Sequence, residues 1–165
     1  MILTKKSILE EIKNKKLKIN PYNPRNVGSD SIDLTLDNKF RIFNHKKVTL
    51  TENVDYKKYS KLIKRDKIML MPGQFILGIT KEKIKMPENV CGFLYGRTRF
   101  ARFGLSIHTT ASFIHAGVHN HQVFEISNES NVPLILKAGT KIAQLILMRT
   151  EGNAKYDKRW NNQKL

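Results

Sequence analysis

Alternating apolar and polar residues through most of the chain predict β-strands. The clearest case is Ser31-Ile-Asp-Leu-Thr-Leu36, where every second residue is apolar, as in a strand with one buried face. Short apolar segments separated by glycine, proline or asparagine predict further strands at 39–43, 47–51, 67–70, 75–80, 90–95, 104–109, 123–127, 133–136 and 142–148. Many short strands at such spacing are typical of a sandwich or barrel, not of alternating strands and helices.

One helix is predicted near the start of the chain, from Ser7 to about Lys16. Ile8, Leu9 and Ile12 share one face of this segment, and Thr4 is a suitable N-cap.

The 165 residues fit one domain with a small extension. We divide the chain into residues 1–150 and a polar C-terminal segment, 151–165, which is either frayed or a flap that orders on a partner. Apolar residues make up 40% and charged residues 27%, as in soluble globular proteins. The single cysteine, Cys91, excludes an intramolecular disulfide framework. Apolar runs fall short of the roughly 18 residues of a membrane span, and the start lacks the apolar core of a signal peptide. We therefore expect a cytoplasmic protein without a membrane partner.

The formal net charge of +16 suits a polyanionic partner, either nucleic acid or the triphosphate of a nucleotide. Basic residues are spread along the chain without a block of five in a row. A general bias toward lysine therefore explains the charge equally well.

The densest basic feature is Gly96-Arg-Thr-Arg-Phe-Ala-Arg-Phe-Gly104, with three arginines and a hydroxyl between two glycines. Arginine forks make bidentate contacts to phosphate oxygens, and glycine lets backbone N–H groups approach them. The spacing differs from that of a Walker loop. The alternative is a solvated basic turn.

A second candidate is Glu125, whose neighbours Phe124 and Ile126 are apolar. Burying a carboxylate is costly, so a glutamate facing a cleft here would suit general acid/base work. The alternative is that Glu125 points outward from its strand.

Four histidines, His108, His115, His119 and His121, form a weaker signal. Their spacing matches no established zinc motif, and a zinc-dependent deaminase also needs a Cys-x-x-Cys pair that one cysteine cannot supply.

Taken together, the ordered motifs resemble those of the deoxycytidine triphosphate deaminase family, a branch of the trimeric dUTPase-like fold. The motifs that carry the resemblance are Ser31-Ile-Asp-Leu34, Pro72-Gly-Gln-Phe-Ile-Leu-Gly78, the segment 96–105, the run 110–128, Gly139-Thr-Lys-Ile-Ala-Gln-Leu145, and Tyr156, Arg159, Trp160 and Gln163 in the tail. The resemblance implies an all-β-dominated, distorted β-barrel with a short N-terminal helix and a C-terminal lid.

The resemblance also implies hydrolytic deamination of dCTP to dUTP and ammonia, with no metal activating the water. Glu125 would be the acid/base, and Thr98 and Arg102 would hold the water and the glutamate in register. Residues expected to bind substrate are Arg97, Arg99, Ala111, His115, Val123, Phe124, Gln144, Tyr156, Arg159 and Gln163. Mg²⁺ would arrive with the triphosphate, and the sites of a homotrimer would lie between subunits.

Several positions depart from the family pattern. An aspartate of the sugar and base pocket is His115 here, a serine of the phosphate motif is Arg99, and a glycine is Asn120. Three alternatives to simple deamination therefore stay open. They are a bifunctional enzyme that continues to dUMP, a dUTP diphosphatase of the same fold, and a non-catalytic module that senses nucleotides or binds nucleic acid.

Overall fold

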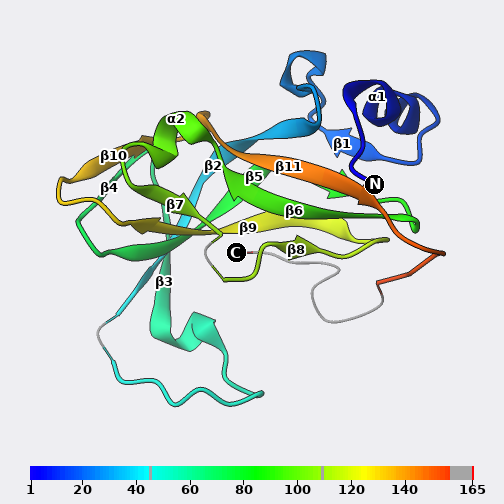
Figure 1. The fold of residues 1–165 in the computed structure, drawn as a ribbon. Helices are drawn as coiled ribbons and strands as arrows, with labels where there is room; N and C mark the ends of the chain where they lie inside the picture. The colour runs from blue at the N-terminus through cyan, green and yellow to red at the C-terminus, as the bar shows by residue number, and fades with distance from the viewer. Residues whose placement is uncertain (45, 109, 157–164) are drawn as a thin grey trace.

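Nine strands form one curved sheet in the order β7-β9-β5-β2-β11-β6-β8, with β1 paired to β5 and β3 paired to β2 (Figure 1). The computed structural model describes residues 1–44, 46–108, 110–156 and 165. The strands of this sheet are β1 (Lys18–Asn20), β2 (Ser31–Phe43), β3 (Ser60–Lys64), β5 (Phe75–Lys85), β6 (Val90–Gly96), β7 (Leu105–Ile107), β8 (Phe113–Ile114), β9 (His119–Asn128) and β11 (Lys141–Arg149). β4 (Lys67–Leu70) and β10 (Leu134–Lys137) form a separate antiparallel pair.

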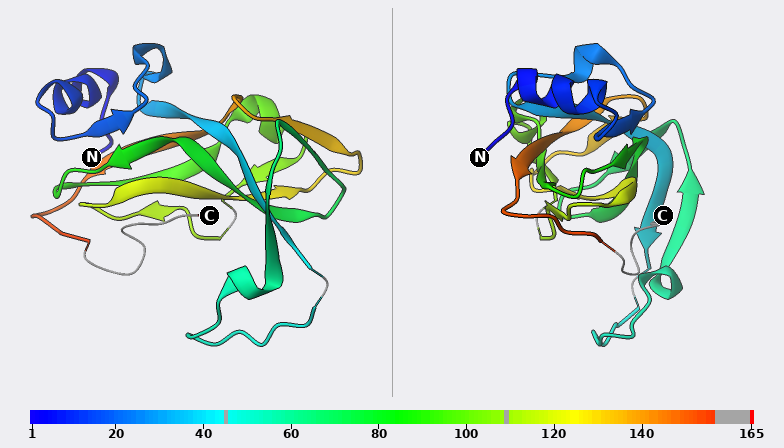
Figure 2. Two further views of the ribbon diagram at one scale, coloured as in Figure 1. Left: turned by 180° about the vertical axis from the view of Figure 1, so that it is seen from behind. Right: turned by 90° about the vertical axis from the view of Figure 1, so that its right-hand side faces the viewer.

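The sheet is strongly curved, as the views in Figure 2 show. Alternation along β2 places Ile32, Leu34 and Leu36 in the buried core, at most 2% exposed. Phe124 and Ile126 on β9 are also fully buried. Period-two patterning therefore decides which face of each strand is covered, and the predicted all-β class is confirmed.

The predicted helix is α1 (Lys5–Lys13), which begins two residues earlier and ends three residues earlier than expected. Thr4 occupies the N-cap position, but its side chain makes no capping hydrogen bond. Buried Glu11 accepts a hydrogen bond of 2.5 Å from Arg149 of β11, which ties the helix to the sheet. No helix in the described part of the chain is long and apolar enough to cross a membrane.

The strand predicted at 47–51 is wrong. Val48 and Leu50 are 40% and 83% exposed, so their alternation has no core to face. This segment belongs instead to a long excursion between β2 and β3, which extends away from the sheet in Figure 1. The excursion ends in a 3₁₀ turn, η2 (Tyr56–Tyr59).

The glycine-bounded arginine segment contains one helical turn, α2 (Thr98–Ala101). Gly104 ends this turn with a φ of +77°, and a Cβ there would lie 2.7 Å from Cβ of Ser130. Only glycine fits such a position without strain, so the second glycine of the motif fixes how the arginines are presented.

Candidate active site

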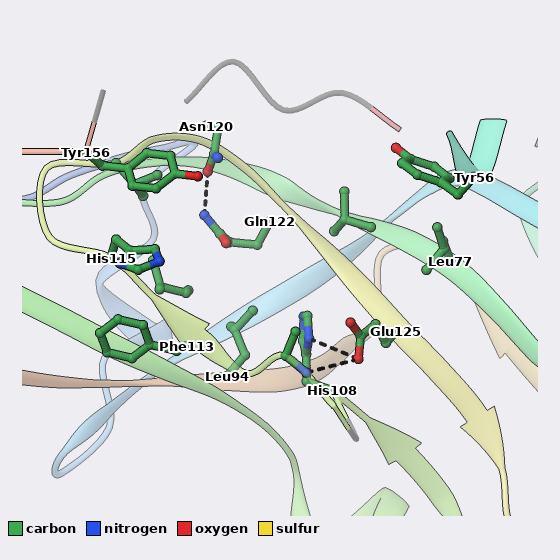
Figure 3. A pocket seen from close by; sticks show the side chains of 14 residues that line it. Tyr56, Leu77, Leu94, His108, Phe113, His115, Asn120, Gln122, Glu125 and Tyr156 are labelled. Atoms are coloured by element: carbon green, nitrogen blue, oxygen red, sulfur yellow. Dashed lines mark hydrogen bonds and ion pairs between the residues drawn. The ribbon is translucent and has the colours of Figure 1, made fainter. Parts of the chain in front are cut away.

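A cavity of about 400 Å³, which we call the Glu125 pocket, opens beside β9 (Figure 3). Its walls are mostly apolar with a few polar side chains, the composition expected of a small-molecule site. The lining residues are Tyr56, Leu77, Leu94, His108, Ala111, Phe113, Ile114, His115, Val118, Asn120, Gln122, Val123, Glu125 and Tyr156.

Glu125 is anchored through one of its two carboxylate oxygens. Oε2 accepts hydrogen bonds from the Thr110 hydroxyl at 2.6 Å, the Thr110 N–H at 3.2 Å and the Ala111 N–H at 3.3 Å. Oε1 accepts none from the described residues. The carboxylate therefore has a fixed orientation and one oxygen left to accept a proton, which is the geometry of a general base.

His108 stands beside Glu125, with its Nδ1 4.0 Å from Oε2. Burial lowers the pKa of His108, and the Glu125 carboxylate opposes that shift in part. Neither ring nitrogen makes a hydrogen bond of ordinary geometry within the described residues. Its backbone has a φ of +55°, which turns the side chain inward after β7. Burial therefore favours the neutral form of this imidazole, which stands against Glu125.

Aromatic side chains close the end of the pocket away from Glu125. The His115 ring stacks on Tyr156 with centroids 4.9 Å apart and meets Phe113 edge-on at 4.8 Å. Gly117 allows the tail this close, because a Cβ there would lie 3.1 Å from the Tyr156 nitrogen. The residue in place of the family aspartate thus packs in an aromatic stack.

Tyr56 enters the pocket wall from the excursion between β2 and β3. Buried Arg41 holds it there: its Nη1 donates to the Ser60 carbonyl and hydroxyl, each at 3.2 Å, and its Cζ lies 5.6 Å from the Tyr56 ring centroid. Ser60 Oγ in turn donates to the Tyr56 carbonyl at 2.8 Å. The buried guanidinium of Arg41 therefore holds the Tyr56 side chain in position.

A second cavity, the arginine pocket, is also about 400 Å³ and shares no lining residue with the first. Its walls are cationic and polar, formed by Asp33, Arg97, Thr98, Arg99, Arg102 and Gln144.

Asp33 holds one of these arginines in place. It accepts from Arg97 Nε at 3.1 Å and from Lys141 Nζ at 3.4 Å, while Arg97 Nη1 donates to the Lys141 carbonyl at 3.0 Å. Three arginines face a single carboxylate here, so the pocket keeps an excess of positive charge suited to an oligoanion.

The family model described as "dCTP deaminase-like" matches residues 2–150. The chain belongs to the dCTP deaminase-like family. The "dCTP deaminase, dUMP-forming" of Mycolicibacterium vanbaalenii is 35% identical over 94% of this chain and 84% of its own length. The resemblance seen in the motifs is thereby confirmed.

Solved structures show the same fold. The 2'-deoxycytidine 5'-triphosphate deaminase of Agrobacterium tumefaciens covers 91% of this chain and 48% of its own, with a TM-score of 0.71 and 17% identity. A dUTPase from phage phi11 of S. aureus covers 87% of this chain and 97% of its own, with a TM-score of 0.52 and 14% identity. The predicted dUTPase-like fold is confirmed.

Not all residues predicted for the site lie together in one chain. Glu125, Ala111, His115, Val123 and Tyr156 line the Glu125 pocket, whereas Thr98, Arg97, Arg99, Arg102 and Gln144 line the arginine pocket. The fully buried Phe124 side chain lies in the core and lines neither cavity. Arg159 and Gln163 lie outside the described residues.

Sequence reasoning missed four polar side chains of the pocket: Tyr56, His108, Asn120 and Gln122. The sequence analysis named His108 only as one of four histidines, and Asn120 only as a departure from the family pattern. No sequence motif marks Tyr56 or Gln122 as a pocket residue. Tyr56 reaches the wall through the long connection between β2 and β3, and Gln122 through an irregularity in the pairing of β5 with β9.

Among the described residues no group of three or more histidine, cysteine, aspartate or glutamate side chains is placed to hold a metal. The arginine pocket supplies one carboxylate, Asp33, and it is shared between two cations. These residues fit Mg²⁺ carried mainly by phosphate oxygens and waters, not an all-protein magnesium cage.

Proposed function

We propose that this chain deaminates dCTP and carries the product on to dUMP. The first step replaces the amino group at C4 by a carbonyl oxygen, consuming one water and releasing ammonia. The second consumes another water at the α-phosphorus and releases diphosphate. The sequence left open whether the reaction stops at dUTP or continues to dUMP; we propose dUMP, because curated relatives are named for forming it.

The geometry of Glu125 is the main support for this proposal. Its Oε2 is fixed by three donors, which leaves Oε1 to take a proton from a water as that water attacks C4. Glu125 then passes the proton to the cytosine base, and the C4 amino group leaves as ammonia. The apolar walls strengthen this chemistry, since charge interactions gain weight where water is excluded.

The triphosphate would bind in the arginine pocket through Arg97 and Arg99, while Thr98 and Arg102 would hold Glu125 and its water in register. Bound Mg²⁺ would neutralise phosphate charge. Arg97 is already oriented by Asp33, so its guanidinium loses little freedom when a phosphate arrives.

A complete site would combine the Glu125 pocket of one copy with the arginine pocket of another. Thr98 and Arg102 line a different cavity from Glu125, which supports this arrangement. Exposed apolar side chains support a partner surface as well: Phe103 is 67% exposed, and the cross-strand pair Met69 and Ile135 is 55% and 64% exposed. We propose a homotrimer on this basis.

The tail beginning at residue 151 would act as a lid in the same site. Tyr156 already stacks on His115 inside the Glu125 pocket. Nucleotide binding would extend this contact to the rest of the tail and exclude water.

The direct test is incubation of the full chain with dCTP or dUTP and Mg²⁺, with nucleotides separated by chromatography and ammonia measured. Formation of dUMP and ammonia from dCTP supports the proposal. Accumulation of dUTP would limit the activity to deamination, and dUMP from dUTP alone would indicate a diphosphatase. No product from either nucleotide would refute the proposal.

A further inference from the structure

Two amide side chains, Asn120 and Gln122, form a pair in the wall of the Glu125 pocket, near Tyr156 (Figure 3). We propose that Gln122, oriented by Asn120, accepts a hydrogen bond from the 3′-hydroxyl of the nucleotide sugar. The pair is thus a specificity determinant for the sugar. The inference rests on the proposed function, because it requires the base to lie at Glu125.

The pair is held rigidly. Gln122 Nε2 donates to Asn120 Oδ1 at 2.5 Å, and the Gln122 N–H donates to the Thr80 hydroxyl at 2.9 Å. Thr80 Oγ1 donates in turn to the Glu82 carbonyl at 2.7 Å. Asn120 and Gln122 are only 3% and 7% exposed, so little rotamer freedom is left.

This arrangement leaves the Gln122 carbonyl oxygen as the acceptor. Oε1 receives no hydrogen bond from the described residues, yet it is not one of their buried unpartnered atoms, so it is open to the cavity. An oriented carbonyl oxygen that is open to the cavity can accept a hydrogen bond from the cavity's contents. The apolar side chains Leu94, Ile114 and Val118 line the same cavity, and Tyr156 stands beside the pair.

The position along β9 indicates which group supplies the donor. Gln122 precedes Glu125 by three residues of strand, so their Cα atoms lie about 10 Å apart, and both side chains line the pocket. With C4 of the base at Glu125, we place the sugar between these two side chains. A deoxynucleoside triphosphate has one free sugar hydroxyl, the 3′-hydroxyl, and a hydroxyl can donate to a carbonyl.

The test compares dissociation constants for dCTP and 2′,3′-dideoxy-CTP, which lacks only that hydroxyl. A Glu125→Gln parent with Mg²⁺ is used so that neither nucleotide is consumed. We expect the parent to prefer dCTP by about fivefold, the effect of one neutral hydrogen bond. Gln122→Met keeps side-chain length without the carbonyl, so the preference should vanish while dideoxy-CTP affinity is unchanged.

Two further variants keep the test decisive. Gln74→Met, in a turn where Gln74 Oε1 accepts from the Met71 N–H, lies outside the pocket and should keep the fivefold preference. Asn120→Gly removes the orienting partner and should lower the preference to about twofold, which tests the pair even if Gln122→Met fails to fold.

Equal affinity of the parent for the two nucleotides, or an unchanged preference in Gln122→Met, would overturn the inference. A water held by Gln122 alone would give that result. Failure to bind either nucleotide would overturn both the inference and the proposed function. Absence of deamination by the wild-type chain, with the fivefold preference intact, would overturn only the proposed function.

Discussion

The Glu125 pocket and the arginine pocket have similar volumes but opposite chemistry. The first is mostly apolar and fixes one carboxylate beside a buried imidazole. The second is polar and carries three arginines around one carboxylate. A base that must exchange protons needs partial desolvation, whereas a triphosphate needs mobile water and several cations.

Keeping the two pockets apart on one chain has a physical consequence. Arg97 pairs with Asp33, and no described arginine pairs with Glu125. Within the described part of the chain, no lysine or arginine therefore neutralises this carboxylate. It would meet Arg102 only where a second copy brings the two cavities together.

The largest effect should come from Glu125→Gln. The amide keeps the shape of the side chain but cannot take a proton, so kcat should fall by on the order of 10²–10⁴. Nucleotide affinity should stay within about tenfold, since the change acts mainly on the transition state. Ammonia release and calorimetric titration measure the two quantities. Near-normal turnover would remove Glu125 from the mechanism.

Arg102→Ala should lower turnover. Without the guanidinium that would hold Glu125 and its water in register, kcat should fall by about 100-fold. Arg65→Ala is a matched control, because Arg65 lies on an exposed turn and its guanidinium donates to the neighbouring Lys64 carbonyl. Equal effects of the two substitutions on kcat would show that general charge, and not Arg102 itself, supports turnover.

Deletion of residues 151–165 should raise KM and lower kcat by several-fold each, because the lid no longer closes the Glu125 pocket. The deletion also removes Tyr156 and Leu165; the latter packs against Leu77 and Ile79. A small drop in melting temperature is therefore expected. Unchanged steady-state rates would contradict the lid.

The smallest effect should be the pH dependence of stability set by His108. Because the folded-state pKa lies below the unfolded value of 6.5, the unfolded chain binds more protons as pH falls. The free energy of unfolding should therefore decrease as the pH is lowered from 6.5 toward 5. Thermal unfolding of His108→Asn should show a flatter pH profile; asparagine tolerates the positive φ at this position.

His119→Asn is the comparison for this measurement. Burial and the nearby cations Lys83, Lys85 and Lys18 lower the pKa of His119, but this side chain is largely exposed. Replacing His119 should therefore flatten the pH dependence of thermal unfolding less than replacing His108 does. An unaltered profile in His108→Asn would contradict the buried neutral imidazole.

The sequence predicted most strands that have a core to cover, such as β2 with Ile32 and Leu34 buried on one face, but it missed the short strands β1, β3 and β8. It failed at 47–51, where Leu50 alternates toward solvent. Alternation reports a buried face only when another element covers it, and that depends on tertiary packing.

For the site, the motifs predicted Glu125 and the arginines but could not show that they line separate cavities. The position of His108 depends on its positive φ, and the position of Tyr56 depends on its contact with Arg41. Neither feature leaves a pattern in the local sequence. Gln122 fell just before the strand predicted at 123–127, and the register shift between β5 and β9 is invisible in the sequence.

The shared site is tested most directly by complementation between two defective variants. Chains carrying Glu125→Gln or Arg102→Ala are co-expressed in equal amounts, purified together, and assayed for dUMP formation from dCTP against each variant alone. In a trimer with sites between copies, about one site in four would combine an intact Glu125 with an intact Arg102. We therefore predict about a quarter of wild-type activity in the mixture. Activity no higher than the mean of the two variants assayed alone would show that each chain builds its site by itself.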